Sequence, residues 1–178
     1  MIDRPQYLRA LRRWKDKQMI KVITGIRRCG KSTLMELFQA ELRLDGVPDS
    51  QIIAVNLEDF ANIELRDPMK LHAYILSRAG NERAYVFLDE IQNVRDFPPM
   101  IDSLFLHKNL DLYLTGSNAY MLSGELATHL SGRYVTIDML PLSFSEYGQP
   151  GRLERHIPPL SGDELSLCHR AGRRPEGD

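Results

Sequence analysis

The sequence predicts an α/β fold, in which helices cover both faces of a mostly parallel sheet of five strands. The first observation is that short apolar runs alternate along the chain with longer segments of helical periodicity. The second is a glycine-containing loop at 25–32, between an apolar run and the helix expected after it. The third is the acidic pair Asp89-Glu90, which ends a later apolar run. Ligands of open α/β sheets bind at the carboxyl ends of the strands, so both features predict a binding site there.

The composition is that of an ordinary globular protein, with 43% hydrophobic and 26% charged residues among 178. No apolar run approaches the roughly 20 residues of a membrane span. The N-terminus lacks the apolar core of a signal peptide, so we expect a cytoplasmic protein with no membrane partner. The two cysteines, Cys29 and Cys168, predict no disulfide framework.

The first half of the chain alternates between helical and strand patterns. Its first helix is amphipathic, because Tyr7, Leu8, Leu11 and Trp14 fall on one stripe. The expected elements of this half are a helix over 3–17, a strand over 19–24, a helix over 31–45, a strand over 51–57 and a helix over 67–80.

The second half continues the alternation up to residue 147. The expected elements are a strand over 84–90, a helix over 96–106, a strand over 110–115, a helix over 119–131 and a strand over 134–138. After Gly148 the chain becomes rich in Gly and Pro and has little apolar periodicity. We therefore interpret 148–178 as an irregular or disordered tail.

The loop at 25–32 has the spacing G-x-x-x-x-G-K-S of a phosphate-binding loop, in the required context between a strand and a helix. Its glycines let successive backbone N–H groups face an anion, and the helix adds its positive N-terminal end. We expect Lys31 to contact the β- and γ-phosphates and Ser32 to ligate Mg²⁺. The expected nucleotide contacts are Gly25, Ile26, Arg27, Arg28, Cys29, Gly30, Lys31, Ser32 and Thr33.

The pair Asp89-Glu90 has the pattern of a Walker B motif, since it ends an apolar strand downstream of a phosphate loop. We expect Asp89 to hold the Mg²⁺ shell. Glu90 would orient or deprotonate the water that attacks the γ-phosphate. These assignments predict ATP and Mg²⁺ as cofactors, with Lys31 and Glu90 as catalytic residues.

The strand over 110–115 is followed by the polar residues Ser117 and Asn118. A polar side chain here would lie between the phosphate loop and the acidic pair, where it could contact the γ-phosphate. The same residues would also suit a turn that caps the next helix. Both interpretations stay open, and the two roles are compatible.

Five segments, taken together, resemble the AAA+-type predicted ATPases of bacteria and archaea. They are residues 25–32, 87–92, 114–118, 130–133 and 140–147. The resemblance covers 1–147 and implies a P-loop NTPase three-layer sandwich with strand order 5-1-4-3-2. Members of the family are typically longer and carry a C-terminal domain after the ATPase. The segment 148–178 would then be a truncated remnant of the lid and C-terminal region.

Arg133 falls on the family's recurrent Gly-Arg pair, just before the last expected strand. Ring-forming ATPases often place an arginine finger there, which reaches the γ-phosphate of a neighbouring subunit. The resemblance thus makes Arg133 a candidate catalytic residue and implies self-association. An ordinary surface or salt-bridge arginine is the alternative.

The predicted function is Mg²⁺-dependent ATP hydrolysis coupled to an unknown client, either DNA or a protein. Ten Lys or Arg residues in 1–31, against two Asp, slightly favour an acidic partner, although we interpret most of them as a solvated helix face. A non-hydrolysing ATP-binding switch or truncated remnant is the alternative function. A P-loop kinase is disfavoured because no arginine-rich lid follows. A guanine-specific switch would need an Asn-Lys-x-Asp element, which the sequence lacks.

Overall fold

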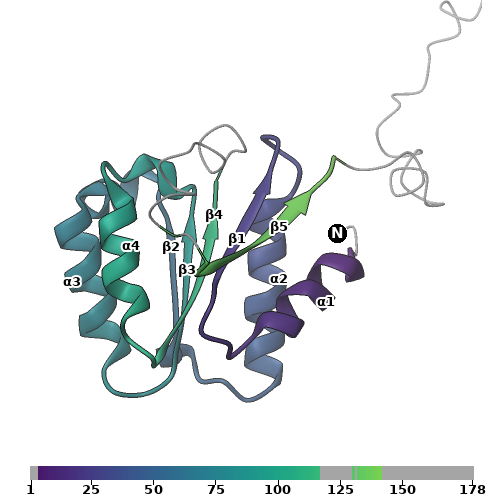
Figure 1. Ribbon diagram of the computed structural model, residues 1–178, viewed down its shortest axis with the longest axis horizontal. Coiled ribbons are helices and arrows are strands. Elements are labelled where there is room, and N and C mark those ends of the chain that lie inside the picture. Colours follow the sequence, from purple (N-terminus) through teal and green to yellow (C-terminus); the bar gives the residue numbers. More distant parts are fainter. Residues whose placement is uncertain (1–3, 117–129, 131, 142–178) are drawn as a thin grey trace, which may run out of the picture. The chain divides into compact units, whose positions relative to one another are not determined.

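Five parallel strands form one sheet with the order β2-β3-β4-β1-β5 (Figure 1), as predicted. The computed structural model describes residues 4–116, 130 and 132–141. The strands are β1 (Ile20–Gly25), β2 (Ile52–Asn56), β3 (Ala84–Asp89), β4 (Leu110–Thr115) and β5 (Tyr134–Met139). The helices among these residues are α1 (Pro5–Trp14), α2 (Lys31–Leu44), α3 (Pro68–Ala79) and α4 (Phe97–Phe105), with 3-10 turns η1 (Asp49–Gln51), η2 (Phe60–Arg66) and η3 (Ile91–Asn93).

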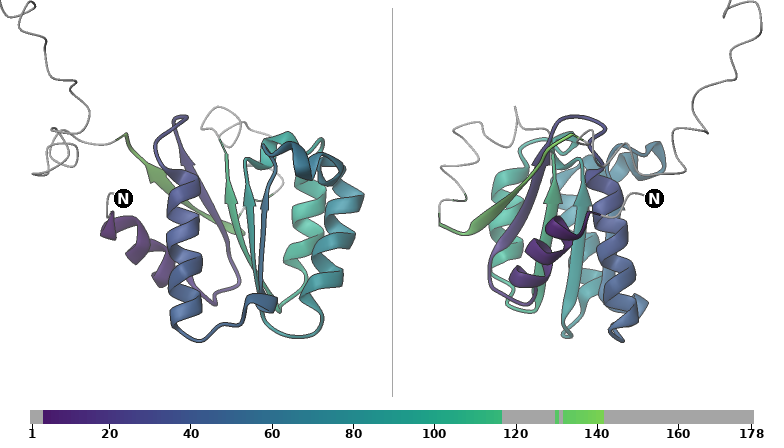
Figure 2. Two further views of the ribbon diagram at one scale, coloured as in Figure 1. Left: turned by 180° about the vertical axis from the view of Figure 1, so that it is seen from behind. Right: turned by 90° about the vertical axis from the view of Figure 1, so that its right-hand side faces the viewer.

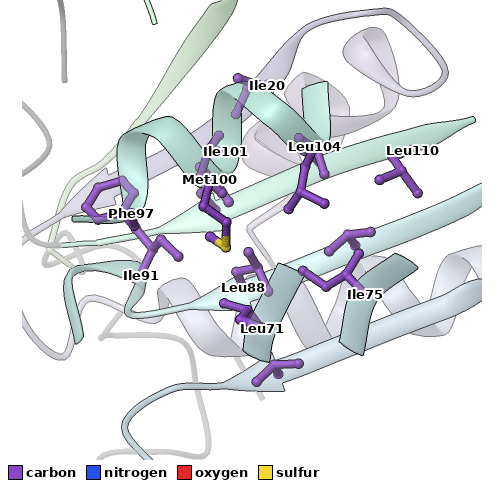
Figure 3. Close-up of a cluster of buried hydrophobic side chains, with 14 of the residues drawn as sticks. Ile20, Leu71, Ile75, Leu88, Ile91, Phe97, Met100, Ile101, Leu104 and Leu110 are labelled. Carbon is purple, nitrogen blue, oxygen red and sulfur yellow. The ribbon is translucent and has the colours of Figure 1, made fainter. Parts of the chain in front are cut away.

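The helices lie in two layers, one on each face of the sheet (Figures 1 and 2). Strand residues alternate between the layers, because successive side chains of a strand point to opposite faces. Val86 and Leu88 of β3 pack with α3 and α4 in the core drawn in Figure 3. Tyr85 and Phe87 of the same strand pack with α1 and α2 instead. The result is the predicted three-layer sandwich.

The ends of α3 follow from its flanking residues. Asp67 is its N-cap, and the carboxylate accepts hydrogen bonds of 2.9 Å from the backbone N–H groups of Met69 and Lys70. Pro68 occupies the first helical turn, where its missing N–H costs no hydrogen bond. The helix ends at Ala79 and is followed by its C-cap Gly80, which has a φ of +55°. The expected limits of 67–80 are therefore nearly those observed.

The prediction for the first helix, 3–17, was too long. Helix α1 ends at Trp14, and Asp16 takes a left-handed backbone with a φ of +63°. Its backbone N–H donates to Asp111 Oδ2 at 2.9 Å, so a tertiary contact stabilises the end of the helix. The predicted helix over 119–131 lies outside the described residues except for Leu130. The predicted boundary at residue 147 also lies outside them.

Strand order decides which strand ends meet at the candidate site. Because β4 lies between β1 and β3, the carboxyl ends of these three strands are adjacent. Ile23 of β1 is in register with Thr115, and Leu88 of β3 is in register with Leu114. The residues that follow these pairs, in the loop after β1 and at the end of β3, are therefore brought to one edge of the sheet.

Candidate nucleotide-binding site

The loop between β1 and α2 requires glycine at both of its ends. A Cβ atom at Gly25 would lie 2.5 Å from the carbonyl oxygen of Met139 and 2.6 Å from Cys29 Sγ. Gly30 has a φ of +96° and is the N-cap of α2. A side chain at either position would be strained or would displace its neighbours. The loop is thus folded tightly against the end of β5, and it leads directly into the N-terminus of a 14-residue helix.

Lys31 opens α2, and its side chain is buried beneath this loop. Its Nζ donates to the carbonyl oxygens of Gly25, at 3.3 Å, and Ile26, at 3.4 Å. The same Nζ lies 3.6 Å from Oε1 of Glu90. The ammonium group is therefore held at the mouth of the loop by oxygen atoms that an anionic phosphate could replace.

One hydroxyl joins the two acidic residues at the end of β3. Thr115, the last residue of β4, donates its hydroxyl hydrogen to Asp89 Oδ1. It also accepts the backbone N–H of Glu90 at 2.8 Å. Glu90 has a left-handed backbone with a φ of +55°, which turns the chain out of the strand. This hydrogen-bonded triplet holds the Asp89 carboxylate and the Glu90 backbone at the end of β3.

Sequence reasoning missed Thr115. The expected polar contact at the end of this strand was assigned to Ser117 and Asn118, which lie outside the described residues. A strand that ends in threonine, next to a strand that ends in Asp-Glu, contained the information. The deciding fact is the pairing of β3 with β4, which brings Thr115 to residues 25 and 26 positions earlier in the chain.

Gln92 also contacts the catalytic candidate Glu90. Its Nε2 donates to Glu90 Oε2. Its Oε1 is buried, and among the described residues it has no hydrogen-bond partner. An unsatisfied buried oxygen costs free energy unless water or a ligand group binds it. Gln92 also lines a cavity, and its Oε1 can accept a hydrogen bond from a group bound there.

Two adjacent cavities, each bordered by Ser32, lie at this end of the sheet. The larger has a volume of about 430 Å³. It is lined by Arg27, Arg28, Gly30, Lys31, Ser32, Thr33, Glu58 and Glu90. The other, of about 320 Å³, includes Ser32 and Asp89 in its wall. The predicted phosphate-binding and metal-binding residues therefore share one region, which contains cations, the N-terminus of α2 and carboxylates.

The oxygen atoms of Ser32 and Asp89 suit Mg²⁺, a hard cation that prefers oxygen ligands. The described residues contain no group of three or more His, Cys, Asp or Glu that could hold a metal ion. Mg²⁺ usually completes its shell with water and substrate phosphates rather than with protein ligands. The residues present therefore fit a metal ion that binds together with a nucleotide.

The sequence model of a family described as an AAA domain matches residues 17–148, well over half of the chain. The chain belongs to this AAA domain family. Membership indicates a nucleotide-binding domain of the ATPase type. The match begins before β1 and ends after β5, so it includes all five strands.

Two longer proteins are related to this AAA domain over most of its length. A protein of Haemophilus influenzae is 41% identical over 149 residues, which cover 83% of this chain and 37% of that protein. A protein of Methanocaldococcus jannaschii is 34% identical over 131 residues, covering 72% of this chain and 28% of that protein. Both are described as uncharacterized. The chain thus spans well under half the length of either relative.

Solved structures share the fold at low sequence identity. AMPPCP-bound DnaA from Aquifex aeolicus superposes with a TM-score of 0.54 at 12% identity, covering 91% of this chain and 53% of that one. A DNA polymerase III gamma-subunit-related protein from Thermotoga maritima gives 0.54 at 13%, covering 92% and 54%. Drosophila ORC bound to DNA gives 0.52 at 12%, covering 80% and 93%. At these identities the similarity shows a common fold.

Arg133 lies at the other end of the sheet from the loop between β1 and α2. Its backbone carbonyl accepts the N–H of Ile20, the first residue of β1, at 2.8 Å, whereas the loop follows the last residue of that strand. Its guanidinium donates to Asp102 Oδ1 at 2.9 Å. The structure therefore separates Arg133 from the other predicted catalytic residues, Lys31 and Glu90.

Several of the basic residues of 1–31 are buried or paired with a carboxylate. Arg4 and Lys21 are buried. Arg12 pairs with Glu41 at 2.5 Å, and Lys15 pairs with Asp45 at 3.2 Å. The exposed basic residues of α1 and its end are Arg9, Arg12, Arg13 and Lys17. No helix among the described residues is long and apolar enough to cross a membrane.

Proposed function

We propose that this AAA domain binds ATP and hydrolyses it to ADP and phosphate in the presence of Mg²⁺. The observation that supports the proposal is the cluster of Lys31, Asp89, Glu90 and Thr115 at the mouth of the loop. A loop that only bound phosphate would need Lys31 and its amides. It would not need Glu90, a second carboxylate beside Asp89, whose backbone N–H bonds to Thr115.

Lys31 and the loop amides bind the phosphate chain in this proposal. The ammonium exchanges its contacts with Glu90 and the loop carbonyls for phosphate oxygens, which offer more negative charge. Ser32 and Asp89 would hold Mg²⁺, which when bound neutralises charge on the β- and γ-phosphate oxygens. Thr115 keeps the Asp89 carboxylate oriented toward that position.

Glu90 is the proposed general base. Once Lys31 turns to the phosphates, its ion pair with Glu90 weakens, and the carboxylate can accept a proton from the attacking water. Gln92 would hold one carboxylate oxygen while the other faces the water. Glu90 is thereby released from Lys31 only when a nucleotide is bound.

The experiment measures ATP affinity and ATP turnover separately in the same preparations. Lys31→Ala should abolish nucleotide binding, because it removes the cation at the phosphates. Glu90→Gln should keep ATP binding and lose turnover, because an amide cannot accept the proton. Glu82→Gln, an exposed substitution before β3, is the matched control and should behave like the wild type.

Hydrolysis at the wild-type rate by Glu90→Gln would refute the assignment of the base. Tight ATP binding without turnover in the wild type would favour the non-hydrolysing switch. Phosphorylation of an added acceptor would favour a kinase.

The proposed client is DNA or a protein. DnaA and the DNA-bound ORC share the fold, and Arg9, Arg13 and Lys17 are exposed on this chain. ATPase activity should be measured with and without DNA at several salt concentrations. Contacts to DNA phosphates make affinity fall as salt rises, so salt-independent binding would contradict an electrostatic DNA interface.

A further inference from the structure

A buried arginine connects the phosphate loop to the chain that leaves β5. Arg4 precedes α1, and only 7% of its surface is exposed. Its Nη1 donates to the carbonyl oxygen of Cys29, inside the loop, at 3.1 Å. Its Nη2 donates to the carbonyl oxygens of Leu140 at 2.8 Å and Pro141 at 3.4 Å. One guanidinium thus bridges segments that lie 25 and 136 residues away in the sequence.

The surroundings of Arg4 hold the guanidinium in this position. Its Cζ lies 4.7 Å from the centre of the Tyr7 ring, a distance at which a cation is attracted to the ring face. The Tyr7 hydroxyl in turn accepts the backbone N–H of Leu140 at 3.1 Å. A planar group with several donors suits this double contact, which the single point charge of a lysine would serve less well.

The contact with Cys29 has a direct consequence for the phosphate site. Cys29 C=O and Gly30 N–H belong to the same peptide group, and in a planar trans peptide they point in opposite directions. A carbonyl turned toward Arg4 therefore turns the Gly30 N–H away from Arg4. Gly30 lines the larger cavity together with Lys31 and Ser32. Arg4 fixes the Cys29 carbonyl outside the loop and thereby orients the Gly30 N–H to donate to an anion inside the loop.

We propose that Arg4 is a positioning residue for phosphate binding, which orients the Cys29–Gly30 peptide from outside the loop. This inference rests on the proposed nucleotide-binding function. The substrate part that it concerns is the phosphate chain, because Cys29, which accepts this hydrogen bond, belongs to the loop.

The test compares Arg4→Met and Arg4→Lys with the wild type in the full chain, by calorimetric binding of ATP and of inorganic triphosphate. Loss of a charge-assisted hydrogen bond that orients a ligand group should weaken both ligands by about tenfold in Arg4→Met. Because Arg4 does not contact the reacting atoms, KM should rise while kcat stays close to the wild-type value. Arg4→Lys keeps the charge and loses the planar geometry, so it should recover only part of the affinity.

Tyr7→Phe is the matched control. It removes the other side-chain hydrogen bond to Leu140 and leaves Cys29 untouched. It should keep wild-type affinity for both ligands even where it lowers the melting temperature. An equal loss of affinity in Tyr7→Phe would show general loosening of this region and would overturn the inference.

The remaining outcomes separate the inference from the proposed function. A wild type that binds neither ATP nor triphosphate refutes the proposed function itself. A wild type that binds, with Arg4→Met equally tight, refutes only the role of Arg4. If Arg4→Met fails to fold, Arg4→Lys carries the test, and full wild-type affinity in that variant would show that charge alone suffices and would overturn the orienting role.

Discussion

Thr115 uses its single hydroxyl for two hydrogen bonds within the candidate site. It donates to the carboxylate proposed to hold Mg²⁺ and accepts from the backbone of the residue proposed as the base. The side chain is fully buried, so water does not compete for either hydrogen bond. A residue with no direct contact to a nucleotide could therefore control the geometry of both acidic residues.

We predict that Thr115→Val lowers ATP turnover by about 10- to 100-fold, in the range found for outer-shell partners of metal sites. Valine preserves the shape of the side chain. Turnover falls because Asp89 and the Glu90 backbone each lose their hydrogen bond to the Thr115 hydroxyl. Steady-state turnover and ATP affinity provide the measurement. Thr24→Val is the control, since Thr24 is also buried at a strand end but its hydroxyl donates to Asp138. Equal turnover in the two variants would contradict the role of Thr115.

At the scale of elements, β1 and β4 begin at a buried polar network. This network lies at the end of the sheet opposite the candidate site. Lys21 of β1 donates to Asp111 of β4 and to the carbonyl of Lys17 at 2.9 Å. Asp111 also accepts the Tyr113 hydroxyl at 2.9 Å. Burial lowers the pKa of Lys21, and the nearby Asp111 carboxylate opposes that shift. The pair fixes the register of the two strands that carry the loop and Thr115.

Asp111→Ala should lower the free energy of unfolding by about 3–5 kcal/mol, because it leaves Lys21 as a buried charge without its partner. Urea denaturation monitored by circular dichroism gives the value. Asp49→Ala removes one partner of an exposed pair with Arg43, at 2.6 Å, and should cost no more than about 1 kcal/mol. A similar cost for both variants would show that the buried pair contributes little to stability.

Alkaline pH should unfold the domain through the same network. Burial, and then the Asp111 charge, raises the pKa of Tyr113 above its ordinary value of 10.0. The unfolded chain therefore loses this proton first, so the stabilisation is complete below pH 10.0 and is lost as pH rises above it. The melting temperature should fall less steeply above that pH in Tyr113→Phe than in the wild type. Parallel pH profiles for the two proteins would contradict this coupling.

At the scale of the whole molecule, the separation of Arg133 from the loop limits how it could act. The loop follows the end of β1, whereas Arg133 contacts the start of that strand. Its own subunit's nucleotide is thus out of reach. If Arg133 acts as an arginine finger, it must do so on a second copy of the chain, after release from Asp102.

Mixing two inactive variants tests this arrangement. Arg133→Ala and Glu90→Gln should each lose turnover and keep ATP binding. A mixture should regain part of the activity, because some interfaces combine an intact Glu90 with an intact Arg133 from the neighbour. Light scattering on the same samples reports association. Full activity of Arg133→Ala alone would leave Arg133 as an ordinary ion-paired residue.

The sequence by itself predicted the five strands and most of the described helices. The spacing of Gly25, Gly30 and Lys31 identified the loop, and the Asp-Pro and Gly residues around α3 marked its limits. Apolar alternation identified the strands. These features depend on neighbours along the chain, within a turn of helix or a few residues of strand, and therefore leave a readable local pattern. The strand order followed from the resemblance to a known family.

Only the tertiary structure decided which distant residues meet. It placed Thr115 between Asp89 and Glu90, Arg4 against Cys29, and Lys21 beside Asp111. These partners are between 25 and 90 residues apart. The contacts of Thr115 and Lys21 depend on strand order and register, which pair whole strands and leave no mark on any single segment. The contact of Arg4 depends on how the start of α1 packs against the loop after β1. The residues that position the candidate site were for this reason visible only once the sheet was assembled.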